Sequence, residues 1–204
     1  MKSSTFILTI LLSCFLCASN ISSIKIVQVT TDIRLTAGYL TYPFVYFFSS
    51  IILATTNRIV FFKTIVSSYL FYLFFLFLML LTANMDGIES QKFLNQSFIE
   101  IFNISSYRVF LSSLLAYFVS MFIFGYLFIK MVNVKNENLR LFLSLILSLL
   151  VDVFLFLFLS FYGKYSLPFL FELIFIAGVK KILFQLVLLP FSIFLIILIR
   201  KYDV

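Results

Sequence analysis

The sequence contains no histidine and no tryptophan, and acidic residues are scarce: 8 Asp and Glu stand against 15 Lys and Arg. Without histidine, the chain lacks the commonest general base and metal ligand of proteins. This excludes serine–histidine hydrolases and zinc enzymes in their usual form. We therefore expect no catalytic residues, no metal site and no cofactor.

Cysteine is also rare, and its placement is uninformative. Cys14 and Cys17 form a C-x-x-C pair, but they lie within an apolar run that lacks the surroundings of a redox or metal motif. We interpret them as two small apolar residues and expect no disulfide.

Apolar residues dominate what is present. They make up 63% of the chain, only 11% of residues are charged, and the mean hydropathy is +1.17. Several long uncharged runs at this composition indicate an all-α polytopic membrane protein and exclude a soluble domain. The net charge of +7 fits Lys and Arg residues flanking membrane spans better than contact with nucleic acid.

The run lengths predict about six transmembrane helices in one bundle, forming a single transmembrane domain over residues 1–204. We expect the first to be a retained helix rather than a cleaved signal peptide, because so many spans follow it. The predicted spans are about residues 5–27, 36–54, 59–83, 108–128, 141–162 and 171–199. Lys92–Phe102 is too short and polar to span, and its apolar residues four apart predict a short interfacial helix.

Six spans place both termini on one side, and the basic residues favour that side as the cytoplasm. Its Lys and Arg residues are Lys2, Arg58, Lys63, Lys130, Lys135, Arg140, Arg200 and Lys201. The opposite side carries fewer, which are diluted by acidic residues: Lys25, Arg34, Lys92, Arg108 and Lys164.

The segment Ser144–Phe161 is apolar enough to cross a bilayer, yet it carries Asp152 near its middle. A charge at that depth costs about 2.5–3.5 kcal/mol on insertion scales. Ser144, Ser148 and Asp152 recur every four residues and share one helix face, so we expect this face to contact protein or a water-filled cavity.

Such a carboxylate needs a partner, and Lys180 in the next apolar segment is the candidate. If the two helices form a hairpin across residues 163–170, both charges lie roughly 15 Å from its turn at about 1.5 Å per residue. Ser148, one turn from Asp152, could add a hydrogen bond. Alternatively, Lys180 and Lys181 mark the true start of the last helix and snorkel to the interface.

A second polar face lies on the fourth span. Ser113, Tyr117 and Ser120 share a face, with Ala116 beside them. We expect Ser113 and Tyr117 to face the same cavity as Asp152. The alternative is that these small and hydroxylated residues serve only helix packing.

Several short motifs, in order along the chain, resemble those of one family. Thr36-Ala37-Gly38-Tyr39-Leu40-Thr41-Tyr42-Pro43 resembles the T-A-G…F-P signature of queuosine-precursor transporters, a family of small vitamin-uptake-type membrane transporters. The run from Arg108 to Tyr117 resembles its R-x-x-x-x-S-x-x-A-Y helix. Ser144, Ser148 and Asp152 resemble its S-T-x-x-S-Q-x-x-D-T helix.

The resemblance extends over about residues 19–190. Ser19-Asn20 matches the end of the family's first helix, and Lys180 and Pro190, ten apart, resemble its final K…P helix. The chain also departs from the pattern, with a thinner set of polar residues. Ser49, Ser50 and Ala54 stand where the family has Thr, Asp and a further acid. Met121 and Phe124 replace its Gln and Asp on the fourth span, and Leu149 and Val153 replace its Gln and Thr on the fifth.

The resemblance implies import of a queuosine precursor, a 7-deazaguanine-type base or queuine, for tRNA modification across the bacterial cytoplasmic (inner) membrane. It implies a substrate site formed by Asn20, Arg108, Ser113, Tyr117, Ser148, Asp152 and Lys180. Direct nucleic-acid binding is not expected. An ATPase partner or a homo-oligomer is compatible with it, because substrate-binding subunits of vitamin importers share this architecture and the chain has no phosphate loop.

Three alternatives stay open from sequence. The chain could be the substrate-binding membrane subunit of an importer for another vitamin-like molecule, or a structural or assembly protein that transports nothing. An intramembrane aspartyl enzyme would need a second carboxylate, and only Glu172, near a helix end, is available.

Overall fold

The computed structural model describes residues 3–23, 25–28, 34–85, 87–102 and 104–202. Within them the chain is all-α apart from one hairpin of two three-residue strands, which confirms the predicted fold class. The helices are α1 (Ser3–Ser22), α2 (Gly38–Thr55), α3 (Arg58–Ala83), α4 (Lys92–Ile101), α5 (Ile104–Lys130), α6 (Glu137–Phe161) and α7 (Leu167–Tyr202). All of these except α4 are long and apolar enough to cross a membrane.

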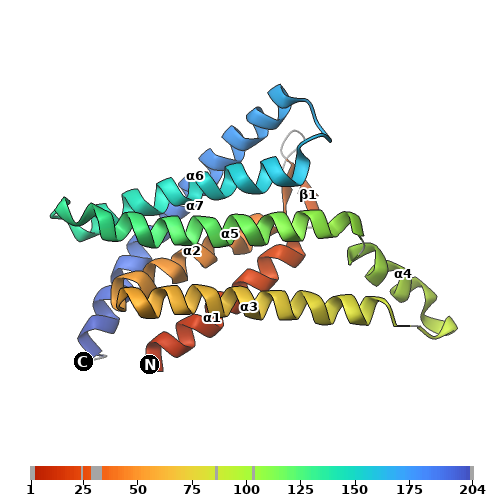
Figure 1. Cartoon of the computed structure of the whole chain (residues 1–204), viewed down its shortest axis with the longest axis horizontal. Coiled ribbons are helices and arrows are strands. Elements are labelled where there is room, and N and C mark those ends of the chain that lie inside the picture. The colour runs from red at the N-terminus through yellow and green to blue at the C-terminus, as the bar shows by residue number, and fades with distance from the viewer. Residues whose placement is uncertain (1–2, 24, 29–33, 86, 103, 203–204) are drawn as a thin grey trace.

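The six long helices form one bundle. Figure 1 shows both termini at one end, together with the α2–α3 and α5–α6 connections. The helix α4 and the α6–α7 turn lie at the opposite end, so the long helices alternate in direction (Figure 1). The turn after α6 uses Gly163, whose φ of 81° favours glycine.

The first helix ends five residues before its predicted end at Val27. Ser22 and Ser23 donate side-chain hydrogen bonds to the carbonyls of Ala18 and Ser19, at 2.6 Å each, and so compete with continued helical pairing. Strand β1 (Ile26–Gln28) then pairs antiparallel with β2 (Arg34–Thr36), in the register Ile26↔Thr36. The prediction of one helix to Val27 was therefore wrong.

The helix α4 is present as predicted from the sequence, and none of its residues is buried. The ring of Phe98 in α4 contacts that of Phe102, with centroids 5.0 Å apart. The ring of Phe102 stacks on that of Phe110 in α5, with centroids 6.0 Å apart. This aromatic series ties the short helix to the end of the bundle.

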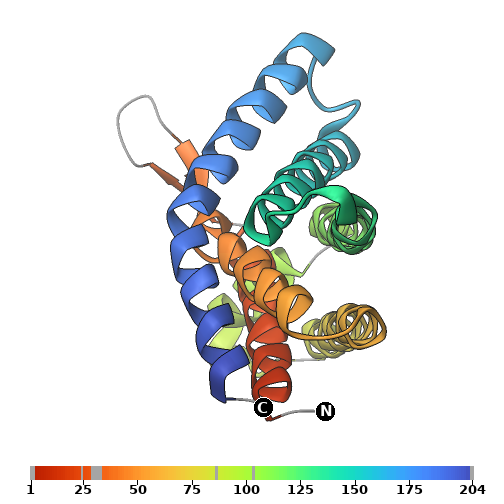
Figure 2. The same cartoon turned by 90° about the vertical axis from the view of Figure 1, so that its left-hand side faces the viewer.

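The last helix is the least buried of the six, and it crosses the bundle obliquely (Figures 1 and 2). It is 36 residues long, longer than predicted, and continues through Gly178 and Pro190. Its neighbours are α2 and α6. Apolar packing and a few polar contacts together hold α7 against those two helices.

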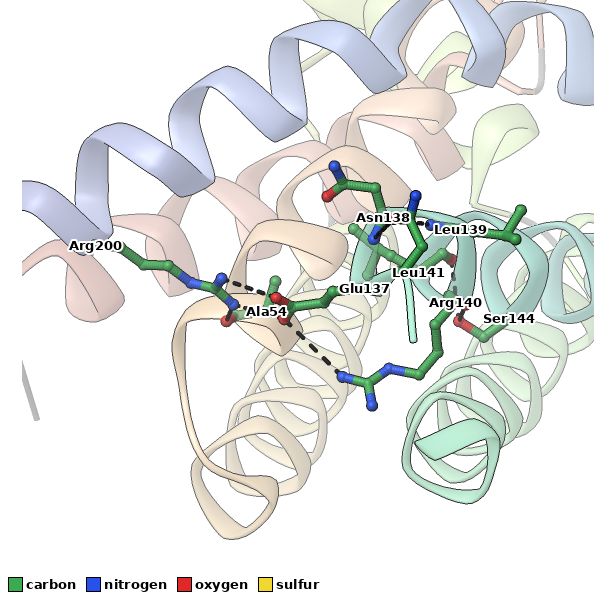
Figure 3. Close-up of polar contacts among 9 residues, drawn as sticks. Ala54, Glu137, Asn138, Leu139, Arg140, Leu141, Ser144 and Arg200 are labelled. Atoms are coloured by element: carbon green, nitrogen blue, oxygen red, sulfur yellow. Dashed lines mark hydrogen bonds and ion pairs between the residues drawn. The ribbon is translucent and has the colours of Figure 1, made fainter. Parts of the chain in front are cut away.

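One of these contacts lies at the terminal end of the bundle. The guanidinium of Arg200 donates to both carboxylate oxygens of Glu137, at 2.6 and 2.9 Å, and to the carbonyl of Ala54 at 2.5 Å (Figure 3). Three helices thus meet at one side chain. Arg140, also near Glu137, places its guanidinium 4.1 Å from the centre of the Phe128 ring.

We expect Glu137→Gln to lower the free energy of unfolding by about 1 kcal/mol or less, because the two side chains of the pair are 45% and 40% exposed. The charge exchange Glu137→Arg with Arg200→Glu should recover part of the loss. Thermal unfolding in detergent is measured for Glu137→Gln, for the single variants Glu137→Arg and Arg200→Glu, and for the exchange that combines the last two. A loss in the exchange as large as the sum of the single losses would contradict a direct interaction.

Candidate functional site

The centre of the candidate site is the carboxylate of Asp152 on α6. It is 1% exposed and has two partners from different helices. The hydroxyl of Tyr42 on α2 donates to Oδ1 at 2.6 Å, and Nζ of Lys181 on α7 donates to Oδ2 at 2.9 Å. One buried charge therefore joins α2, α6 and α7.

The partner of Asp152 is Lys181 and not Lys180, so the predicted pairing was wrong by one residue. Adjacent residues on a helix point about 100° apart at 3.6 residues per turn, so only one of them can face α6. The neighbouring buried residues Gly178 and Gln185 lie three before and four after Lys181, which places Lys181 on the inward face of α7. Lys180 lies off this face, about 100° away around the helix.

The ammonium group of Lys181 gains a second stabilising contact from Tyr42. Its Nζ lies 3.9 Å from the centre of the Tyr42 ring, close enough for a cation–π interaction. Tyr42 thus contacts both charges, one through its hydroxyl and one through its ring. A buried ion pair offsets its desolvation only with good geometry and additional hydrogen bonds, and Tyr42 supplies one such hydrogen bond.

Further hydroxyl groups extend from this centre through α2, α5 and α3. The hydroxyl of Tyr46, one turn after Tyr42, donates to Ser120 at 3.0 Å, and Ser120 donates to the backbone carbonyl of Tyr117 at 3.0 Å. The hydroxyl of Tyr117 is 2.8 Å from that of Ser68 on α3. These groups are all buried, so a polar layer crosses the apolar bundle.

The prediction that Ser113 and Tyr117 face the same cavity as Asp152 stays a prediction, because no contact among the described residues joins either side chain to Asp152. Tyr117 and Ser113 are buried, at 0% and 7% exposed. The hydroxyl of Tyr117 points to Ser68 on α3, and its backbone carbonyl accepts from Ser120, which in turn accepts from Tyr46.

Two further predicted residues, Ser148 and Asn20, make contacts other than those expected. Ser148 donates to the carbonyl of Leu145 in its own helix at 2.8 Å, so Tyr42 and not Ser148 provides the extra hydrogen bond to Asp152. Asn20 on α1 is buried and donates to Leu16 at 2.8 Å. Both side chains are turned toward backbone carbonyls of their own helices.

Arg108 is placed at the far end of α6. It donates to the carbonyls of Leu159 and Tyr162, at 2.8 and 2.6 Å, and is exposed. A guanidinium there satisfies carbonyls that a helix end leaves unpaired. Leu159 is seven positions after Asp152, which separates the two groups by about 10 Å along α6 at about 1.5 Å per residue. Arg108 is therefore not part of the Asp152 cluster.

The arrangement suits binding of a polar molecule. The carboxylate can accept hydrogen bonds from N–H groups, and the ammonium group can donate to carbonyls. The described residues hold no group of three or more Cys, Asp or Glu side chains of the kind that binds a metal ion.

Sequence reasoning missed Tyr42 and Lys181. Tyr42 stands where the resembled signature has Phe, so its hydroxyl was a visible departure from an apolar position. The position of Lys181 could have been found from Gly178, Gln185 and Ser192, which are small or polar residues spaced seven apart in an otherwise apolar helix. That spacing marks one helix face, and Lys181 belongs to it while Lys180 does not.

We expect Tyr42→Phe to destabilise the protein more than Tyr46→Phe. The first removes a hydrogen bond to a charged group, which is worth about 1.5–3 kcal/mol, and the second removes one between neutral groups, worth about 0.5–1.5 kcal/mol. Thermal unfolding of both variants in detergent gives the comparison. Equal losses would show that the charge of Asp152 does not strengthen the hydrogen bond from Tyr42.

The comparisons with known proteins give one match. The family model described as "Putative vitamin uptake transporter" matches residues 36–195, from β2 to the last part of α7. Neither the curated proteins nor the solved structures include a match to the chain. The matched range contains Tyr42, Asp152 and Lys181 and covers well over half of the sequence. The chain therefore belongs to the vitamin-uptake transporter family of integral membrane proteins.

Proposed function

We propose that the protein imports a queuosine precursor, a 7-deazaguanine-type base or queuine, for tRNA modification. The observation that carries the proposal is the Asp152–Lys181–Tyr42 cluster, which is buried among three helices of an apolar bundle. Intramembrane charges are costly and mark substrate or ion pathways. The ordered motifs shared with queuosine-precursor transporters supply the choice of substrate.

Uptake of labelled 7-deazaguanine bases and queuine into liposomes containing the pure protein tests the proposal. We expect accumulation above that of empty liposomes, and loss of it in Asp152→Asn. If a folded protein transports none of these compounds but takes up another vitamin-like molecule, the broader family description holds and the queuosine assignment fails. If uptake requires an added ATPase, the protein is the substrate-binding subunit of an importer.

We also propose that the protein lies in the bacterial cytoplasmic membrane with both termini in the cytoplasm. The excess of Lys and Arg at the terminal end supports this orientation. Reporter fusions after Asn136 and after Tyr165 should therefore report the cytoplasmic and the opposite side, respectively. Both fusions reporting the same side would contradict the six-span topology.

A further inference from the structure

The inward face of α7 carries polar side chains along the stretch that packs on α2 and α6. Gly178, Gln185 and Ser192 are buried and follow one another at intervals of seven residues, so they share a face. Lys181, which pairs with Asp152, lies on the same face between the first two. Ser192 satisfies its hydroxyl by donating to the carbonyl of Leu189.

Gln185 differs from its neighbours on this face. It is 2% exposed, and neither Nε2 nor Oε1 has a hydrogen-bond partner among the residues that the structure describes. Buried polar groups in proteins are nearly always hydrogen-bonded, and an unsatisfied side-chain amide is costly. Gln185 is one helical turn from Lys181, so this cost falls next to the ion pair.

A second buried group without a partner in the described structure lies in the facing stretch of α2. The helices α2 and α7 run in the same direction, because Tyr39 contacts Ala177 and Ala54 contacts Arg200. The stretch of α2 between those two residues therefore lies alongside the stretch from 177 to 200 of α7. Ser49, whose Oγ is also unpartnered and buried, lies within that part of α2.

We propose that Gln185 binds the transported molecule through a pair of hydrogen bonds to a lactam edge, a ring N–H beside a ring carbonyl. The side-chain amide has one acceptor oxygen and a donor nitrogen side by side, which matches that edge in both position and polarity. Lys181 and Asp152 lie one turn along to receive other polar groups of the same ring. The inference deepens the proposed function and rests on it, since 7-deazaguanine bases carry such an edge.

The first test uses the unmodified protein in detergent. Its melting temperature is measured with guanine, 7-deazaguanine and hypoxanthine, and with the N1-methylated form of each, which lacks the ring N–H. We expect the lactam bases to raise the melting temperature and their methylated forms to bind about tenfold or more weakly, as expected for a buried acceptor left unpaired. No shift with any lactam base, or equal shifts with the methylated forms, would overturn the proposal.

The second test compares Gln185→Leu with Gln96→Leu, the same change at an exposed position of α4. Removing an unsatisfied buried amide should raise the melting temperature of the ligand-free protein by about 2–4 °C while abolishing the shift with lactam bases. Gln96→Leu should change neither. A Gln185→Leu protein that still responds to guanine as the parent does would overturn the proposal.

The lactam site and the queuosine assignment can be rejected independently of each other. A shift with guanine that depends on Gln185, without uptake of any deazaguanine base or queuine, would retain the lactam site and reject the queuosine assignment. Uptake of deazaguanine bases that is unaffected by Gln185→Leu would retain the queuosine assignment and reject the lactam site at Gln185.

Discussion

Lys181→Met is expected to lower membrane yield and thermal stability sharply, whereas Lys180→Met should leave both close to those of the parent. The reason is that Lys181 alone pairs with Asp152, at 2.9 Å, and its side chain is only 11% exposed. Removing one partner of a buried ion pair costs about 3–5 kcal/mol, because the remaining charge stays buried without compensation.

The same comparison extends to Asp152. Asp152→Asn alone should destabilise the protein because it leaves the ammonium group of Lys181 without its counter-ion. The double variant Asp152→Asn with Lys181→Met should recover much of the folding stability, since removing a whole buried pair is often tolerated. It should not recover uptake if the carboxylate contacts substrate.

Membrane yield and unfolding temperature in detergent measure the effect on folding, and liposome uptake measures the effect on transport. They are compared for the parent, the three single variants and the double variant. A larger loss in Lys180→Met than in Lys181→Met would show that the pairing seen in the structure is not the one that holds the helices together. Equal yields in all the variants would show that the pair contributes nothing to folding.

The sequence predicted the helices well because a membrane span needs one property above all, a long apolar run. It also identified Asp152 as buried, since a carboxylate in the middle of such a run has few alternatives. The first conclusion rests on the average hydropathy of a segment, and the second on the depth of one residue in the membrane. Neither depends on how any one helix is rotated about its axis.

The choice between Lys180 and Lys181 does depend on that rotation. Depth along α7 differs between them by about 1.5 Å, too little to discriminate, while their directions differ by about 100°. The rotation is set by packing of α7 on α2 and α6, including the approach of Tyr39 to Ala177. That information lies in three helices together and not in the last one alone.

Polar side chains that bond within their own helix misled the site prediction in another way. A serine such as Ser148 looks available for a neighbour when read from sequence. In an apolar bundle its hydroxyl can instead donate to the preceding turn, and here it bonds to Leu145. A tyrosine cannot reach its own helix in this way, so the hydroxyls of Tyr42, Tyr46 and Tyr117 supply the contacts between helices.

The junction of α1 with α2 brings together two motifs that lie apart in sequence. Gly38 begins α2 directly against the end of α1, and a Cβ placed on it would lie 2.7 Å from the backbone oxygen of Ser19 and would also clash with Oγ of Ser23. Ser22 and Thr41 add a contact between hydroxyls at 3.2 Å. The glycine of the T-A-G motif thus allows close approach to the Ser-Asn segment.

We therefore expect Gly38→Ala to destabilise the protein by about 1–3 kcal/mol, the usual cost of overpacking. The Ser23 side chain can rotate away, but the Ser19 carbonyl belongs to the α1 backbone and moves only if the two helices separate. Adding Ser23→Ala to Gly38→Ala should consequently rescue only part of the loss. Thermal unfolding in detergent measures each variant.

Gly178→Ala is the matched control, because the nearest atom to a Cβ there is Cδ2 of Leu150 at 3.5 Å, an ordinary contact. Without a clash, replacing a helical glycine with alanine should stabilise the protein by roughly 0.5–1 kcal/mol through the lower entropy of the unfolded chain. The two identical substitutions should thus change stability in opposite directions. A stabilising Gly38→Ala would show that α1 and α2 are not packed as closely as the contact with Ser19 requires.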